Sequence, residues 1–179
     1  KPVLFEINPN GMQIPVISFK PTGLQYYLYD CALNPIESLF VPYPETIQPI
    51  FVRGDSPVKY RNIDGNIYVE MVVDLIQNKS ALLDSKKIEV ICLILSGTFS
   101  WEDGAFSSSV LQVKAPSEFV NRIKDRLGVS ILVGNESASL AYAEKCLIGQ
   151  DFKNLIFVNI CFGVGAGIII DGKLFTGAG

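Results

Sequence analysis

Residues 158–175 read VNICFGVGAGIIIDGKLF. This pattern predicts two strands joined by a glycine-spaced turn, and then a hairpin turn at Asp171-Gly172 that leads into a third strand. The hairpin is expected because a type I′ turn needs positive φ at both central residues, which Asp and Gly tolerate. The apolar run Ile156–Ile160 favours a strand that is covered on both faces. The stretch therefore predicts part of a buried sheet.

Glycines alternate within this stretch, at Gly163, Gly165 and Gly167. Alternate residues of a strand share one face, so this face is expected to be bare backbone that another group can approach closely. A phosphate group is one candidate for that neighbour. The other candidate is a strand or helix that packs against the glycines, and the glycine spacing does not decide between the two candidates.

The composition is that of a folded protein with a sizeable core. Of the 179 residues, 49% are hydrophobic and 18% are charged, which suits one domain, or one domain with part of another. The net charge is −3 and Lys and Arg do not cluster, so no nucleic-acid surface is expected in this chain. Because the sequence has no histidine and its four cysteines are far apart, a zinc site and a histidine-based triad are excluded. No apolar run reaches the roughly 18 residues of a membrane span, and no signal peptide opens the chain. We therefore expect a cytoplasmic protein without a membrane partner.

The order of predicted elements is that of an α/β domain with a mixed sheet. An antiparallel meander of three strands opens it, and strands alternating with helices follow. Gly128 is expected to end the second helix as its C′ residue. The predicted strands are 14–19, 24–29, 36–41, 88–95 and 131–133, and the predicted helices are 66–78, 117–127 and 137–148. The first of these helices is predicted from an apolar stripe at Val69, Val72, Val73 and Ile76, which recur with helical spacing.

Polar residues follow two of these strands at their carboxyl ends, where open α/β sheets usually bind ligands. Ser96-Gly97-Thr98 is a small-residue loop after the buried strand 88–95. Asn135 and Glu136 stand in the predicted loop 134–136, directly before a helix. Asn is a favoured N-cap residue and Glu is favoured in a first helical turn, so helix capping explains them as well as a ligand site does.

Two segments together resemble the ROK family of repressors, open reading frames and sugar kinases. Gly163–Leu174 is similar to the glycine-rich second phosphate segment of that family, and Val133–Glu144 is similar to its sugar-site loop and helix. The resemblance covers nearly the whole chain and implies the actin-like ATPase (ribonuclease H-like) fold. It also implies two groups of site residues. The sugar effector would contact Asn135, Glu136, Gly97 and Ser109, and a vestigial phosphate site would include Thr22, Gly163 and Gly165.

The departures from the family pattern indicate that this chain is not a working kinase. Family kinases carry Asp-x-Gly-x-Thr in the first hairpin, and the matching residues 18–22 are SFKPT, so only Thr22 agrees. Ser18 cannot supply the carboxylate oxygen that metal–phosphate chemistry needs. Phe162 stands where the family has Thr between two glycines, and Glu136 replaces the Asp that acts as general base. We therefore expect no catalytic residue, no metal ligand, and no use of ATP or Mg²⁺.

The resemblance also predicts how the chain is divided. Residues 2–9 are similar to the strand that follows a winged helix–turn–helix domain in family regulators. We expect a leader strand at 1–12, the N-terminal actin-like lobe at 13–152, and the first hairpin of a second lobe at 153–179. DNA contact is expected only through a domain that precedes Lys1, and structural zinc only in a segment that follows Gly179. By the same resemblance the protein is expected to form a homodimer or a higher homo-oligomer.

These observations predict the effector-binding region of a ROK-type transcriptional regulator, with a sugar or sugar phosphate as effector. Two alternatives remain open. A divergent sugar kinase would phosphorylate a hexose with ATP. A kinase-like scaffold would have lost ligand binding as well and would serve dimerisation alone.

Overall fold

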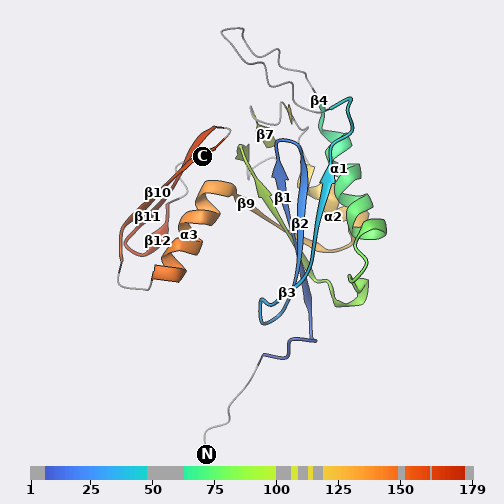
Figure 1. The fold of residues 1–179 in the computed structure, drawn as a ribbon, viewed down its shortest axis with the longest axis horizontal. Coiled ribbons are helices and arrows are strands. Elements are labelled where there is room, and N and C mark those ends of the chain that lie inside the picture. The colour runs from blue at the N-terminus through green and yellow to red at the C-terminus, as the bar shows by residue number, and fades with distance from the viewer. Residues whose placement is uncertain are drawn as a thin grey trace, which may run out of the picture.

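A computed structural model describes residues 7–47, 63–99, 106–108, 113–114, 119–148, 152–161 and 163–175. Figure 1 shows a central sheet with helices α1 and α2 on one side, and with helix α3 and a β-hairpin on the other. Residues 8–11, near the end of the predicted leader strand, form a turn that is closed by a hydrogen bond from the Gly11 N–H to the carbonyl oxygen of Asn8 at 3.0 Å. Leader residues 1–6, Phe162 and Ser109 lie outside the described residues.

The central sheet has five strands in the order β3-β2-β1-β5-β9. Strands β1, β2 and β3 form the predicted antiparallel meander. Strands β5 and β9 continue the sheet parallel to β1, so the sheet is mixed, as the sequence predicts. The bounds are β1 (Gln13–Lys20), β2 (Gly23–Asp30), β3 (Pro35–Pro42), β5 (Val90–Leu95) and β9 (Ser130–Asn135).

The three predicted helices are all present, with small shifts at their ends. The Asp64 carboxylate accepts a hydrogen bond from the backbone N–H of Asn66 and so caps α1. Gly128 has a φ of 69°, which is the left-handed conformation expected of a residue that ends a helix. The bounds are α1 (Gly65–Asp74), which continues as the π-helical turn η1 (Leu75–Lys79), then the 3₁₀ turn η2 (Ser85–Lys87), α2 (Phe119–Leu127) and α3 (Glu136–Ile148).

The hydrophobic core lies between the central sheet and helices α1 and α2. The apolar stripe predicted for the first helix is buried, and the alternate residues Ile91, Leu93 and Leu95 of β5 face it. Aromatic rings fill the end of this core, where the ring of Tyr43 packs edge-on against that of Tyr68 with centroids 5.1 Å apart. This burial supplies the main hydrophobic stabilisation of the described fold.

Two smaller sheets complete the structure. One has the order β4-β8-β7-β6. Its strands are short: β4 (Ile63–Asp64), β6 (Thr98–Phe99), β7 (Phe106–Ser108) and β8 (Val113–Lys114). The other consists of β10 (Leu155–Ile160), β11 (Val164–Ile170) and β12 (Lys173–Leu174). Its turn at Asp171 and Gly172 has φ values of 49° and 79°, which confirms the predicted type I′ hairpin.

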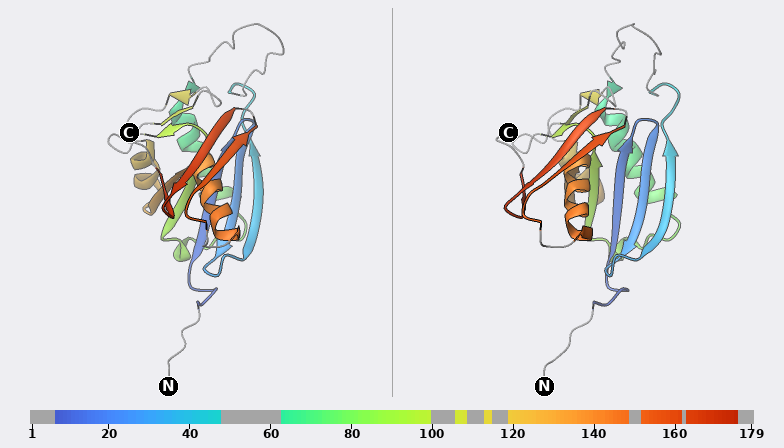
Figure 2. Two further views of the ribbon diagram at one scale, coloured as in Figure 1. Left: turned by 90° about the vertical axis from the view of Figure 1, so that its left-hand side faces the viewer. Right: turned by 60° about the vertical axis from the view of Figure 1, so that its left-hand side comes forward.

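Helix α3 lies between the central sheet and the β10–β11–β12 sheet (Figure 2). The glycine face of β11 packs against this helix. A Cβ atom added to Gly167 would lie 2.2 Å from the carbonyl oxygen of Ser137, and one added to Gly165 would lie 2.3 Å from the Ser137 hydroxyl. The close neighbour that the alternating glycines predicted is therefore a helix at these two positions.

The prediction that Ile156–Ile160 is covered on both faces is wrong in the structure. Burial alternates along β10, and Ile156 and Ile160 are 69% and 74% exposed. Helix α3 packs against one face of the strand, and no described element covers the face that carries these side chains. The apolar run indicated a strand correctly but did not indicate how many of its faces are covered.

Candidate functional site

The carboxyl ends of three parallel strands meet at one edge of the central sheet. The register pairs Ser18 of β1 with Ile94 of β5, and Leu95 of β5 with Asn135 of β9. Lys20 at the end of β1, Ser96 and Gly97 after β5, and Asn135 at the end of β9 therefore stand side by side. This is the edge where open α/β sheets bind ligands.

Asn135 ends a strand and caps a helix. Its side-chain oxygen accepts a hydrogen bond from the backbone N–H of Ala138 at 3.1 Å, which is the bond of an N-cap residue. Its amide nitrogen donates to the carbonyl oxygen of Gly97 at 3.0 Å. The predicted loop 134–136 is therefore absent, because β9 runs to Asn135 and α3 begins at Glu136. The capping interpretation is confirmed, and the same side chain lies at the sheet edge.

The Glu136 carboxylate is held by two partners from the other strands. Its Oε1 accepts a hydrogen bond from the ammonium group of Lys20 at 2.5 Å, and its Oε2 accepts one from the Ser96 hydroxyl. The Glu136 side chain is 22% exposed and that of Lys20 is 40% exposed, so this ion pair is partly shielded from solvent. The pair joins the first hairpin to the first turn of α3.

The Glu136 carboxyl group is stabilised in its charged form. Burial by itself raises the pKa of Glu136, but the hydrogen bonds from Lys20 and Ser96 and the charge of Lys20 outweigh it and hold the pKa below its usual value. The first turn of a helix also favours a negative charge. The site thus carries a carboxylate and an ammonium group at neutral pH.

Lys20 is the functional candidate that the sequence reasoning missed. In the sequence Lys20 stands out only as a departure from the Asp-x-Gly-x-Thr pattern, because its partner Glu136 lies 116 residues further along the chain. The usable signal was its place at the carboxyl end of a strand next to the predicted ligand strands. A charged side chain there reaches the same edge as Asn135 and Glu136.

The other predicted site residues are distributed around this edge. Gly97 joins the cluster through its carbonyl oxygen. Thr22 is exposed in the β1–β2 turn, and its carbonyl oxygen accepts the N–H of Tyr43 at 3.0 Å. Gly165 lies beneath α3 against Ser137, the neighbour of Glu136, whereas Gly163 is exposed just before β11. The structure thus brings Asn135, Glu136 and Gly97 together, and the vestigial phosphate role of the other three stays a prediction.

Within the described ranges, no group of three or more His, Cys, Asp or Glu residues could hold a metal ion. None of the described helices is long and apolar enough to cross a membrane. The site instead offers a carboxylate, an amide, a hydroxyl and an ammonium group, which can accept from or donate to several hydroxyl groups of one ligand.

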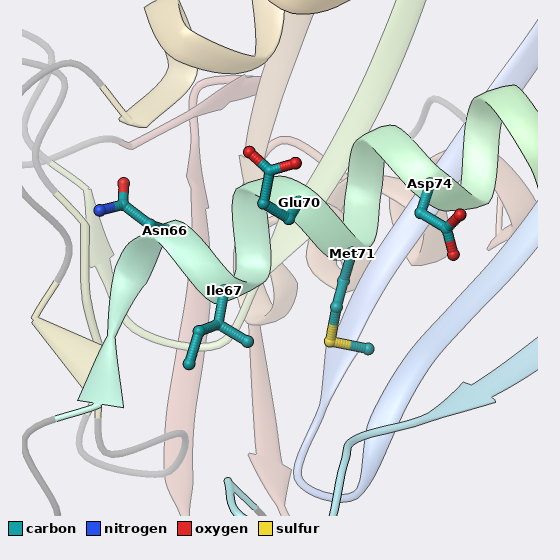
Figure 3. A pocket seen from close by; sticks show the side chains of 5 residues that line it. All are labelled: Asn66, Ile67, Glu70, Met71 and Asp74. Carbon is teal, nitrogen blue, oxygen red and sulfur yellow. The ribbon is translucent and has the colours of Figure 1, made fainter.

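A hollow of about 400 Å³ lies along helix α1, away from the strand-end cluster. Figure 3 shows that its labelled side chains all come from this helix. Its polar side chains already have partners within the protein. Arg122 of α2 donates to Asn66 and Arg126 of α2 pairs with Glu70 at 2.5 Å, while Asp74 pairs with Lys79 at 3.3 Å. The strand-end cluster is therefore the better candidate site. The hollow is lined by Asn66, Ile67, Glu70, Met71 and Asp74.

The chain belongs to the ROK family, whose family model matches residues 62–179. Over 60 residues it is 33% identical to the N-acetylmannosamine kinase of Salmonella arizonae, a match that covers 34% of this chain and 21% of that kinase. A solved ROK family transcriptional regulator, a homologue of the E. coli MLC protein, matches with a TM-score of 0.72 and 20% identity over 95% of this chain and 39% of its own. A ROK family protein from Streptococcus pneumoniae in complex with sucrose matches with a TM-score of 0.66 and 17% identity, over 93% of this chain and 49% of its own.

These matches confirm the predicted family and the actin-like ATPase fold. The matched part spans about a fifth of the kinase and less than half of either solved structure. The similar proteins include a transcriptional regulator and sugar kinases alike, so family membership does not by itself decide between these two functions.

Proposed function

We propose that this chain is the sugar-binding, kinase-like region of a ROK transcriptional regulator and that it does not transfer phosphate. The observation that carries the proposal is the ion pair between Lys20 and Glu136 at the carboxyl ends of the parallel strands. This ion pair holds the Lys20 ammonium group against the carboxylate of Glu136, the residue that stands where family kinases have their general-base Asp.

A general base has to take a proton from a substrate hydroxyl within hydrogen-bond reach. The lowered pKa of Glu136 makes it a weaker base, and the adjacent charge of Lys20 opposes its protonation. Ser18 adds no carboxylate for a metal ion, and Lys20 occupies a position where the family pattern has glycine. All of these features favour binding over catalysis.

Sugar binding is supported by the chemistry of the same cluster. Asn135 and Glu136 project from adjacent positions at the start of α3, and the Gly97 carbonyl lies beside them. Carboxylate and amide groups accept or donate several hydroxyl hydrogen bonds at fixed angles, which suits a sugar. Ser109 remains a further candidate contact under this proposal. The streptococcal ROK protein was solved in complex with sucrose. Sugars are therefore the first class of ligand to test with this chain.

The regulatory output would come from a shift of α3. This helix contacts the central sheet on one side and strands β10 and β11 on the other. A ligand that binds its first turn more tightly in one arrangement would bias the position of α3 and of the β10–β11 hairpin. In the proposed regulator this shift changes how DNA-binding domains of a homo-oligomer are held, while this chain itself makes no DNA contact.

The test uses the full-length protein in two assays. Thermal unfolding is measured with a panel of neutral and phosphorylated sugars, and ADP release is measured with ATP, Mg²⁺ and the same panel. We expect at least one sugar to raise Tm, because a ligand that binds only the folded state stabilises it, and we expect no sugar-dependent ADP release.

Two outcomes would contradict this expectation. Sugar-dependent ADP release would establish the divergent hexose kinase, which the 33% identity to N-acetylmannosamine kinase over 60 residues favours. A panel in which no sugar changes Tm would favour the scaffold that has lost ligand binding. The variant Asn135→Ala, which removes a side chain from the cluster, is expected to abolish any Tm shift that a sugar causes.

A further inference from the structure

We propose that the Lys20–Glu136 ion pair makes the site selective for charge, so that it accepts a neutral sugar and rejects the corresponding sugar phosphate. This inference rests on the proposed sugar-binding function and narrows its ligand class. It makes Lys20, which no sequence motif assigns to the site, a residue that determines specificity.

The cluster at the strand ends pairs one positive side chain with one negative side chain. The described side chains that hydrogen-bond at this edge are those of Lys20, Ser96, Asn135 and Glu136, of which Lys20 carries a positive charge and Glu136 a negative one. Their formal charges cancel. The ammonium group that would otherwise attract a phosphate is already neutralised by a carboxylate at 2.5 Å.

A neutral sugar can bind without breaking the Lys20–Glu136 ion pair. An ionised carboxylate has about four lone-pair positions and an ammonium group has three N–H donors. Lys20 and Ser96 take one position on each carboxylate oxygen, and the pair is open enough to solvent for further contacts, since 40% of the Lys20 side chain is exposed. Sugar hydroxyls can therefore donate to Glu136 and accept from Lys20 while the ion pair stays intact.

A phosphate group gains little binding free energy at this cluster. A dianion placed near Lys20 also lies near Glu136, so the attraction to one is offset by the repulsion from the other. The positive end of α3 would favour an anion, but Glu136 already occupies its first turn. The phosphate would lose hydration without an unpaired cation from this cluster to replace it. Specificity then comes from repulsion as much as from contact.

The experiment is calorimetric titration of the full-length protein with matched pairs of ligands. Suitable pairs are glucose with glucose 6-phosphate and N-acetylmannosamine with its 6-phosphate, together with the other hexoses that raise Tm. We expect the neutral member to bind at least about tenfold more tightly. Tighter binding of the phosphorylated member would overturn the inference.

The variant Glu136→Gln gives the sharper result. It removes the negative charge, keeps the size of the side chain and leaves Lys20 without its carboxylate partner. The ratio of the two affinities is expected to shift toward the phosphate by about tenfold or more, because the ammonium group is then free to pair with it. An unchanged ratio in a variant that unfolds with the same cooperativity as the wild type would contradict the charge mechanism.

Ser96→Ala is the matched control. It removes the other hydrogen bond to Glu136 without changing any charge, so it is expected to weaken both ligands while the ratio of their affinities stays as in the wild type. A ratio that changes equally in both variants would refute the role of charge. If neither member of any pair binds to the wild-type protein, the sugar-binding function itself is contradicted, and this inference with it.

Discussion

Strands β5 and β10 are similar in length and in apolar content, but they are buried very differently. Leu93 of β5 is fully buried, whereas Ile156 of β10 is 69% exposed. Strand β5 lies between two parallel neighbours, and α1 and α2 pack over its core face. Among the described elements, β10 pairs with β11 alone, and α3 packs against one of its faces. Apolar content therefore predicts that a segment is a strand, whereas the burial of that strand depends on elements far away in the sequence.

The two sheets also meet their helices through different surfaces. The central sheet presents large side chains such as Phe19 and Leu24 to its core. Strand β11 presents Gly165 and Gly167 to α3, and Ser137 of the helix occupies the space that side chains at these two positions would need. The first interface is held by buried apolar area and the second by close backbone approach.

The largest expected effect comes from truncating a core side chain of the central sheet. Leu93→Ala is expected to lower the free energy of unfolding by about 2 to 5 kcal/mol, because it leaves a cavity in a packed core. Val158→Ala in β10 is the matched change at a side chain that is 56% exposed, and it is expected to cost less than about 0.5 kcal/mol. Urea denaturation of the full-length variants measures both. If both variants lose the same free energy of unfolding, the proposed difference in burial between β5 and β10 is contradicted.

Filling the glycine face tests the second interface. Gly167→Val would place a Cβ atom 2.2 Å from the Ser137 carbonyl oxygen and 2.5 Å from the Cβ of Ala141, so α3 would have to move. We expect a loss of about 3 kcal/mol, at the upper end of overpacking effects. Ala166→Val adds bulk on the exposed face of the same strand and is expected to be nearly neutral. Comparable unfolding curves for the two variants would show that α3 does not pack tightly on β11.

Alkaline pH is expected to weaken the aromatic end of the core. Burial raises the pKa of Tyr68 to about 12, whereas tyrosine in an unfolded chain titrates near pH 10. Because the folded protein holds the Tyr68 proton more tightly than the unfolded chain does, Tyr68 contributes stability that is fully present below pH 10. It is lost as the pH rises from 10 to 12, because the unfolded state releases its proton first, and it amounts to about 2 to 3 kcal/mol.

Denaturation at pH 9 and pH 11.5 measures that loss, and Tyr68→Phe is the comparison. The variant is expected to lose less stability than the wild type between these two pH values. An identical loss in the two proteins would show that Tyr68 is not responsible. Tyr26, whose pKa burial also raises to about 12, is expected to account for part of the remaining loss.

The smallest expected effect concerns the type I′ turn of the second sheet. Lys145 near the end of α3 donates a hydrogen bond to the carbonyl oxygen of Gly172. Lys145→Met is expected to cost about 1 kcal/mol, the usual net value of such a bond. Lys173→Met removes the same charge from an exposed position on β12 and is expected to have little effect. If hydrogen exchange in 168–175 is unchanged by Lys145→Met, this bond does not hold the turn.

Local pattern predicted the elements and part of the site. The stripe of Val69, Val72 and Val73 and the glycine at 128 predicted helices correctly, because each signal lies within its own segment. Asn135 and Glu136 were predicted as site residues because they stand at the carboxyl end of a predicted strand. Lys20 was missed because its role depends on the pairing of β1 with β5, which no short window of sequence contains. The expected loop before α3 was wrong because one residue performs both the strand end and the cap.

The direct junction between Asn135 and Glu136 makes the spacing of this segment unusually sensitive to length. With no connecting residue between β9 and α3, one residue inserted there would rotate the helix by about 100° relative to the sheet. Glu136 would then point away from Lys20, and Ser137 would leave the glycines of β11. Insertions in the turn at 31–34 would change neither relationship. Length variation among natural relatives of this chain is therefore expected to avoid the β9–α3 junction and to collect in turns such as that one.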